Sequence, residues 1–225
     1  MNTHLHLYEE VLLLALKDEK GTVDWKAGHF QSVLAGAMIA ELLLHGKIEI
    51  DEISNKLVKV VDSTPTRETL LDEALVEINS AKNEKSIEHW VNKFTGFRNH
   101  LQRIARGLCS KGILKETEEK VLLFFTSRRF PEVNPEPERE LIERMRKAIF
   151  TEMEEVDIRT SLLISLCYKS NILSIPFSSV DLKLQKHRIE SIIKGDKIGE
   201  ATTAVIQSIQ TALIAATIVP IVVSS

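Results

Sequence analysis

Apolar residues recur with a period of about 3.6 along most of the chain, which is typical of amphipathic helices. This period predicts helices over residues 8–16, 28–44, 70–78, 87–94, 97–110, 138–153, 160–167 and 181–193. Between residues 28 and 44 the apolar side chains lie on every side of the predicted helix, as in a helix enclosed by others. We therefore expect a mainly α fold built around one buried central helix.

Two stretches break the helical pattern and predict small β-hairpins. Apolar residues alternate with polar ones at 48–50 and again at 58–60, as in a short pair of strands. Further along, the β-rich run Val121–Phe125 leads into Thr126–Pro131, which predicts a strand that feeds a hairpin tip. The prolines that follow, from Pro131 to Pro137, predict a surface connection.

The C-terminal segment carries no charged residue from Ala201 to Ser225, so a membrane anchor has to be considered. Its nearly continuous apolar run, Ala212 to Val223, would reach only about 18 Å as a helix, against a hydrocarbon core of about 30 Å. We favour a buried terminal helix, or a helix followed by a strand. Because no repeat or low-complexity linker divides the chain, we expect a single compact domain over residues 1–225.

The composition describes an ordinary globular protein with little global charge. Of 225 residues, 44% are apolar and 27% charged, and the net charge is -3, which gives no overall attraction to nucleic acid or to an anionic membrane. Cys109 and Cys167 are too few for a disulfide framework and indicate reduced thiols. The residues from Met1 to His6 do not resemble a secretion signal, so we expect a cytoplasmic location.

Motifs for catalysis or metal binding are absent from the sequence, so we predict no catalytic residue, cofactor or metal site. His4 and His6 lie two residues apart but have no neighbouring cluster of Cys, Asp or Glu at metal-ligand spacing. Glu41 falls on the apolar face of the predicted central helix. It is either a proton donor with a raised pKa or, as we favour, a buried partner for an Arg or a helix N-terminus.

Four residues are candidates for an anion-binding patch. Arg98, Arg128 and Arg129 offer guanidinium groups suited to phosphate oxygens, although solvated arginines are the ordinary alternative. Trp25 follows a turn, where it either enters a membrane interface, lies against a ligand or covers a core. An apolar hairpin tip could come from Phe124, Phe125 and Phe130.

Several segments, in order, resemble the Golgi phosphoprotein 3 family. They are Leu7–Asp18, Ala40–Ile50, Thr69–Leu75, Ser110–Leu114 and Val121–Phe124, and the similarity covers roughly Leu5 to Phe125. The resemblance implies a compact helical domain without enzymatic activity that binds phosphatidylinositol 4-phosphate at a membrane surface.

In that family a Trp and several basic residues form the headgroup pocket. Trp25 and Arg98 match two of these positions, whereas Ala35 and Leu101 stand where the family carries basic residues. The family also places its hairpin near the pocket and uses it in self-association. We therefore hypothesise that Arg128 and Arg129 partly replace the missing charge, and that the Val121–Phe130 hairpin can mediate a homo-oligomer.

The main prediction is a peripheral membrane protein that recognises an acidic lipid headgroup and also meets protein clients, at the Golgi if the host is eukaryotic. The alternative is a soluble interaction or scaffold protein that has lost the lipid pocket. A third interpretation, a winged-helix-like nucleic-acid binder, is disfavoured by the net charge, so no nucleic-acid partner is expected. That interpretation would use the basic residues Lys93, Arg98, Arg103, Arg106, Lys111 and Lys115.

Overall fold

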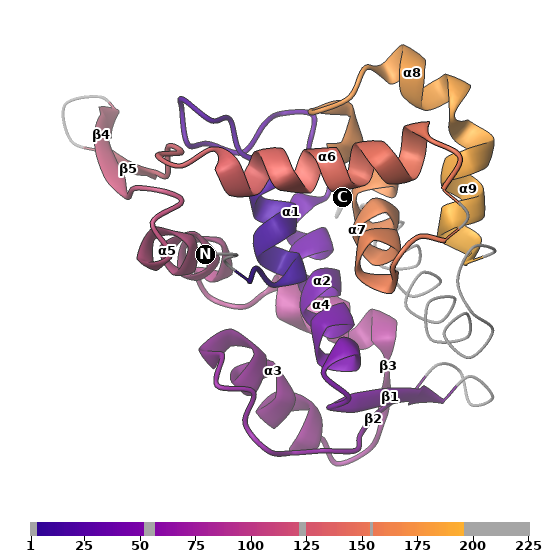
Figure 1. The fold of residues 1–225 in the computed structure, drawn as a ribbon. Helices are drawn as coiled ribbons and strands as arrows, with labels where there is room; N and C mark the ends of the chain where they lie inside the picture. The colour runs from indigo at the N-terminus through magenta and orange to yellow at the C-terminus, as the bar shows by residue number, and fades with distance from the viewer. Residues whose placement is uncertain (1–3, 52–56, 122–124, 154, 196–225) are drawn as a thin grey trace, which may run out of the picture.

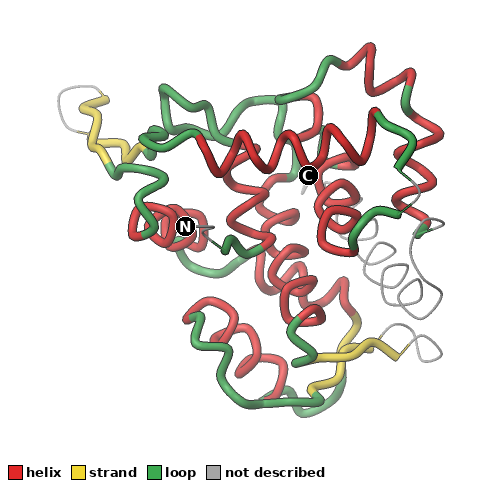
Figure 2. The backbone as a smooth tube through the Cα atoms, viewed as in Figure 1, coloured by secondary structure: helices red, strands yellow, loops and turns green. Residues whose placement is uncertain are grey.

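The computed structural model describes residues 4–51, 57–121, 125–153 and 155–195. Within them it has the helices α1 (Leu7–Ala15), α2 (Phe30–Leu44), α3 (Thr69–Asn79), α4 (Ile87–Thr95), α5 (His100–Ser110), α6 (Glu136–Phe150), α7 (Ile158–Lys169), the 3-10 turn η1 (Ile172–Ser174), α8 (Ser179–Leu184) and α9 (Lys186–Lys194). The strands are β1 (Ile48–Asp51), β2 (Leu57–Val60), β3 (Lys85–Ser86), β4 (Thr117–Val121) and β5 (Phe125–Arg129). The predicted mainly α fold is confirmed (Figure 2).

Two helices, α1 and α2, form the centre of the molecule. Every residue of α1 is buried, and α2 is buried from Val33 to Leu42, which confirms the predicted central helix. Figure 1 shows α5 on one side of this pair, α7 on the other and α6 crossing over it. α4 packs against α2, and its Trp90 and Phe94 are buried. α3 lies beside the small sheet, and α8 and α9 lie at the opposite end (Figure 1).

The predicted hairpin at residues 48–60 is confirmed and carries an additional strand. β1 and β2 pair antiparallel, with Ile48 opposite Val60, and β2 pairs in turn with β3. The strand β3 was not predicted because its two residues are too few for any alternation to show. Ser86 of β3 then caps α4, since its hydroxyl accepts a hydrogen bond from the His89 backbone N–H at 3.3 Å.

Several helix ends differ from the prediction for local reasons. α5 starts at His100 and not at residue 97, because Asn99 has a φ of 54°, outside the helical region. α6 begins already at Glu136 and includes Pro137 in its first turn, where the missing proline N–H has no helical partner to lose. The predicted helix over 181–193 is two helices that meet at Gln185.

The second hairpin differs from its prediction in a way that affects the candidate site. β4 pairs with β5 so that Val121 faces Phe125 and Thr117 faces Arg129. Residues 122–124, which link the two strands in the sequence, lie outside the described residues, and Arg129 lies at the end of β5 away from them. The predicted tip at residues 126–131 is wrong, because the polar run that forms β4 has weak β propensity and does not stand out in the sequence.

The base of this hairpin is joined to the loop that connects α1 and α2. The Phe130 N–H donates to the Gly21 carbonyl and the Glu132 N–H to the Asp18 carbonyl, both at 2.9 Å. Gly21 has a φ of 57°, and a Cβ there would lie 2.1 Å from the backbone nitrogen of Pro131. Only glycine fits so close an approach, so the loop and the hairpin base are held together.

Within the described residues no helix is both long and apolar enough to cross a bilayer. The tail from Ala201 to Ser225 lies outside these residues, and its proposed burial stays a prediction, as does the single domain over residues 1–225.

Candidate functional site

Trp25 projects from the loop between α1 and α2 with 81% of its surface exposed. The alternative that it covers a core is therefore wrong; the buried indole is Trp90, in α4. The loop itself is anchored on both sides of Trp25. The Asp24 N–H donates to the Ala15 carbonyl at 2.7 Å, and the Lys26 ammonium donates to the Ser174 carbonyl at 3.2 Å.

Arg98 is exposed in the short loop between α4 and α5. The loop is held by the left-handed backbone of Asn99 and by a 2.9 Å hydrogen bond between the His100 ring and the Phe97 carbonyl. Arg98 thus lies just before α5, although the predicted helix over residues 97–110 included it.

Arg128 and Arg129 both lie on β5 and both have carboxylate partners. Nε of Arg128 lies 3.5 Å from Oε1 of Glu116. The two carboxylate oxygens of Glu116 also each accept one hydrogen bond from Arg106, at 2.9 Å. Arg129 forms an ion pair with Glu119 across the hairpin. These partners neutralise part of the positive charge that the sequence assigned to a hairpin tip.

Phe130 does not belong to an apolar tip either. It is buried, with only 2% of its surface exposed, at the base of the hairpin. The side chains of Phe124 and Phe125 lie outside what the structure describes.

Backbone hydrogen bonds join the segments that carry two of the candidates. Trp25 and Arg129 lie on segments that backbone hydrogen bonds join, through Gly21 and Phe130. Arg98 lies on a separate loop. Of the two positions that depart from the family pattern, Ala35 is fully buried in α2, whereas Leu101 of α5 is half-buried, with part of its side chain against the core.

The basic residues that suggested nucleic-acid binding are mostly neutralised by acidic partners. Four of the six form ion pairs, which are Lys93–Glu77, Arg103–Glu73, Arg106–Glu116 and Lys111–Glu9. A nucleic-acid surface needs cations free to replace counterions on phosphates, so this arrangement disfavours the third interpretation.

The buried carboxylate of Glu41 is a structural partner for an arginine and for a helix N-terminus, the two kinds of group that the sequence suggested. It accepts a hydrogen bond from the Leu7 N–H, in the first turn of α1, at 2.6 Å, and it pairs with Arg159 of α7 at 3.2 and 3.3 Å. Burial alone would raise the pKa of Glu41, but hydrogen bonds from His6, Arg159 and Leu7 lower that pKa to about 2. The interpretation as a proton donor is therefore wrong.

Arg159 was not singled out in the sequence, yet it connects three parts of the core. Besides Glu41 it contacts Glu10 of α1 at 3.4 Å and donates to the Leu5 carbonyl. Arg144 of α6 reaches the same Glu10 oxygen at 2.9 Å. The ion pairs thus join α1, α2, α6 and α7. The sequence signal that could have indicated Arg159 is the expected burial of Glu41, because a buried carboxylate needs a cation.

Neither cysteine is activated as a nucleophile. Cys167 is fully buried and Cys109 half-buried, and burial raises the pKa of both thiols. Both are free, as expected for reduced thiols.

These features define a mainly α-helical protein whose candidate site consists of side chains exposed on surface loops and a hairpin. The family profile described as Golgi phosphoprotein 3 (GPP34) matches residues 7–209, and the chain belongs to this family.

Similar proteins include the vacuolar protein sorting-associated protein 74 of Eremothecium gossypii, which is 32% identical over 139 residues, covering 53% of this chain and 42% of that protein. The protein of the same name from Schizosaccharomyces pombe is 32% identical over 139 residues, covering 53% of this chain and 41% of the relative. The chain thus spans about two fifths of the length of these relatives.

Proposed function

We propose that this protein is a non-catalytic, peripheral membrane-binding module that recognises an acidic lipid headgroup of the phosphoinositide type, phosphatidylinositol 4-phosphate among them. The observation that carries the proposal is the exposure of Trp25 on an anchored loop in a member of this family. An exposed indole held in one place is costly in water and suits the interface of a bilayer.

Arg98 supplies a guanidinium for the phosphate oxygens in this account. It is exposed, and a guanidinium binds phosphate through paired hydrogen bonds. Arg128 and Arg129 contribute a weaker attraction, because Glu116 and Glu119 already neutralise part of their charge. We propose that the hairpin also serves self-association and that other faces meet protein clients, in the cytoplasm beside a membrane.

A soluble scaffold without lipid affinity is the second candidate function. The observation that favours it is the replacement of two pocket cations, since neither the buried Ala35 nor the half-buried Leu101 carries a charge for a headgroup. Each missing charge-assisted contact is worth about 1.5 to 3 kcal/mol when well formed.

Sedimentation with vesicles distinguishes the two functions. The full chain is mixed with neutral vesicles, with vesicles that contain phosphatidylinositol 4-phosphate, and with phosphatidylserine vesicles of the same charge. The membrane function predicts binding to the anionic vesicles that weakens as salt increases, because salt screens the headgroup attraction. A scaffold predicts no binding to any of them.

Two variants test whether Trp25 and Arg98 contribute to vesicle binding. Trp25→Ala and Arg98→Glu are expected to weaken vesicle binding at least about 10-fold, which corresponds to about 1.4 kcal/mol. The matched controls are Val76→Ala, an exposed apolar residue of α3, and Lys183→Glu, an exposed cation of α8. If the controls weaken binding as much as the test variants, the proposed site is wrong.

A further inference from the structure

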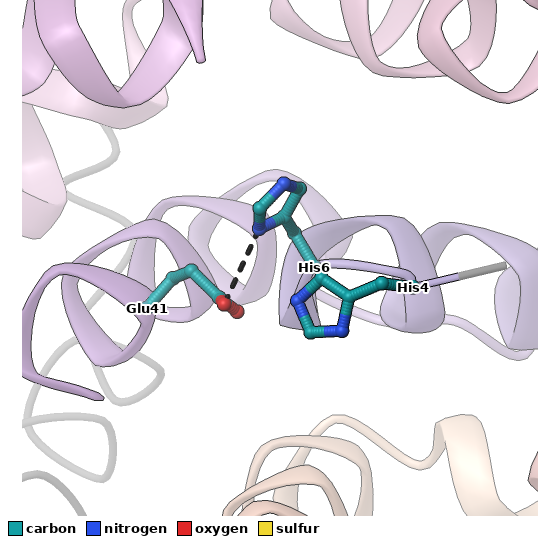
Figure 3. A group of neighbouring side chains, drawn as sticks. All are labelled: His4, His6 and Glu41. Atoms are coloured by element: carbon teal, nitrogen blue, oxygen red, sulfur yellow. Dashed lines mark hydrogen bonds and ion pairs between the residues drawn. The ribbon is translucent and has the colours of Figure 1, made fainter. Parts of the chain in front are cut away.

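The N-terminal segment and the central helix bring together a group of side chains that the sequence separates. His4 and His6 precede α1, and Glu41 lies in α2, 35 positions after His6. In the structure, one ligand atom from each of the three side chains lies within 4.8 Å of the other two. Figure 3 shows the two imidazole rings beside the carboxylate, with the contact between His6 and Glu41 drawn as a dashed line.

The local backbone explains why the two histidines reach the same carboxylate. His6 is extended, with φ and ψ of -81° and 154°, and in extended backbone the residues i and i+2 point to the same side. A pair of histidines in this spacing therefore presents two ring nitrogens to one face. The carboxylate of Glu41 faces them because the Leu7 N–H and Arg159 hold it there.

We propose that His4, His6 and Glu41 form a binding site for a divalent transition-metal ion, with zinc as the best match. Two imidazoles and one carboxylate are a ligand set that zinc accepts in a tetrahedral geometry. Ligand atoms on such an ion lie about 3.3 Å apart, given bonds of about 2.0 to 2.1 Å. Nδ1 of His6 and Oε1 of Glu41 already have this separation, at 3.3 Å.

The surroundings of the three ligands match those of a metal site. Nε2 of His6, the ring nitrogen that faces away from Glu41, lies 3.4 Å from Oε1 of Glu68. A carboxylate in this place orients the imidazole and makes it a better ligand. His45 contacts the same Glu41 oxygen, with its Nε2 at 3.3 Å, and so helps to fix the position of the carboxylate.

Charge and access also allow a cation at this position. The carboxylates of Glu9, Glu41 and Glu68 lie around the group, whereas Arg159 and Lys111 supply two positive charges. With an ion on Oε1 of Glu41, Oε2 still accepts the Leu7 N–H, and Arg159 keeps its contacts with Glu10 and the Leu5 carbonyl. Because His4 is exposed, an ion can reach the ligands from solvent.

Titration calorimetry of the full chain with zinc chloride, after treatment with a chelator, tests the proposal. We expect one zinc ion per chain, and a melting temperature that rises by about 5 to 10 °C when zinc is present at 100 times its dissociation constant. Cobalt bound in place of zinc is expected to show the intense visible bands of a tetrahedral site.

His4→Gln and His6→Gln are each expected to weaken zinc binding at least about 10-fold, and Glu68→Gln, which changes only the outer carboxylate, by a comparable factor. The matched control is His187→Gln, an exposed histidine of α9, which should leave the affinity unchanged.

Three results would overturn the proposal. One is the absence of binding by the parent chain, and another is unchanged affinity in both histidine variants. The third is binding that leaves the melting temperature where it was, because a site formed by the folded N-terminal segment and α2 must stabilise the folded state.

Discussion

Replacing Arg159 with methionine is expected to destabilise the fold strongly, because two buried carboxylates then lose their shared cation. Arg159 lies 3.2 Å and 3.3 Å from the oxygens of Glu41 and 3.4 Å from Glu10, and those carboxylate side chains are 0% and 5% exposed. At these distances one pair is worth about 5 kcal/mol for an effective dielectric constant of about 20. Desolvation of the arginine offsets part of this attraction, so we expect a loss of about 3 to 5 kcal/mol.

Urea unfolding followed by circular dichroism measures this loss directly, and thermal unfolding should show a melting temperature lower by about 6 to 20 °C. The matched control is Arg139→Met, which removes a surface pair with Glu136 whose side chains are 63% and 58% exposed. Such pairs contribute at most about 1 kcal/mol. If Arg159→Met costs no more than Arg139→Met, the buried network does not stabilise the fold as argued here.

Three further predictions concern the protonation of Glu138, the close approach at Gly21 and the missing positive charge at Leu101. Burial beside Asp18 and Glu132 raises the pKa of Glu138 from 4.5 to about 8, so the folded state keeps a proton that the unfolded chain loses as pH rises from 4.5 to 8. Glu138→Gln should therefore stabilise the fold by about 1 to 3 kcal/mol at pH 8 and by nothing at pH 4, and a gain that does not depend on pH would contradict this. Gly21→Ala should lower the melting temperature by about 4 to 8 °C because of its positive φ and its backbone clash, and an unchanged melting temperature would refute the close approach. Because Leu101 is only half-buried, Leu101→Arg should strengthen binding to anionic vesicles several-fold, with Leu184→Arg on α8 as the control for the same added charge, and unaltered binding would count against a headgroup site beside α5.

The helical framework could be predicted because its periodicity is local. The apolar faces of α1, α2, α3 and α4 are each visible within one segment, and Ser86 and Gly96 mark both ends of α4. The left-handed conformation of Asn99 and the division between α8 and α9 depend on contacts made after folding, so the sequence did not reveal them.

The candidate site was predictable only in part, because its electrostatics depend on residues that are distant in the chain. The sequence left open whether Trp25 is exposed or covers a core, and only the conformation of the folded loop decides between these alternatives. The ion pairs of Arg128 and Arg129 depend on the register of β4 and β5, which the sequence placed differently. The contact of His6 with Glu41 joins residues 35 positions apart, a separation that no local pattern reports.

The central claim is that the exposed indole of Trp25 and the exposed guanidinium of Arg98 attach this family member to anionic bilayers. It is tested most directly by the amount of protein that sediments with phosphatidylinositol 4-phosphate vesicles, for the parent chain and for the double variant Trp25→Ala with Arg98→Glu, at low and at high salt. We predict strong sedimentation of the parent at low salt, a marked decrease at high salt, and near-background sedimentation of the double variant. Equal sedimentation of both proteins, or none of the parent at low salt, would contradict the account.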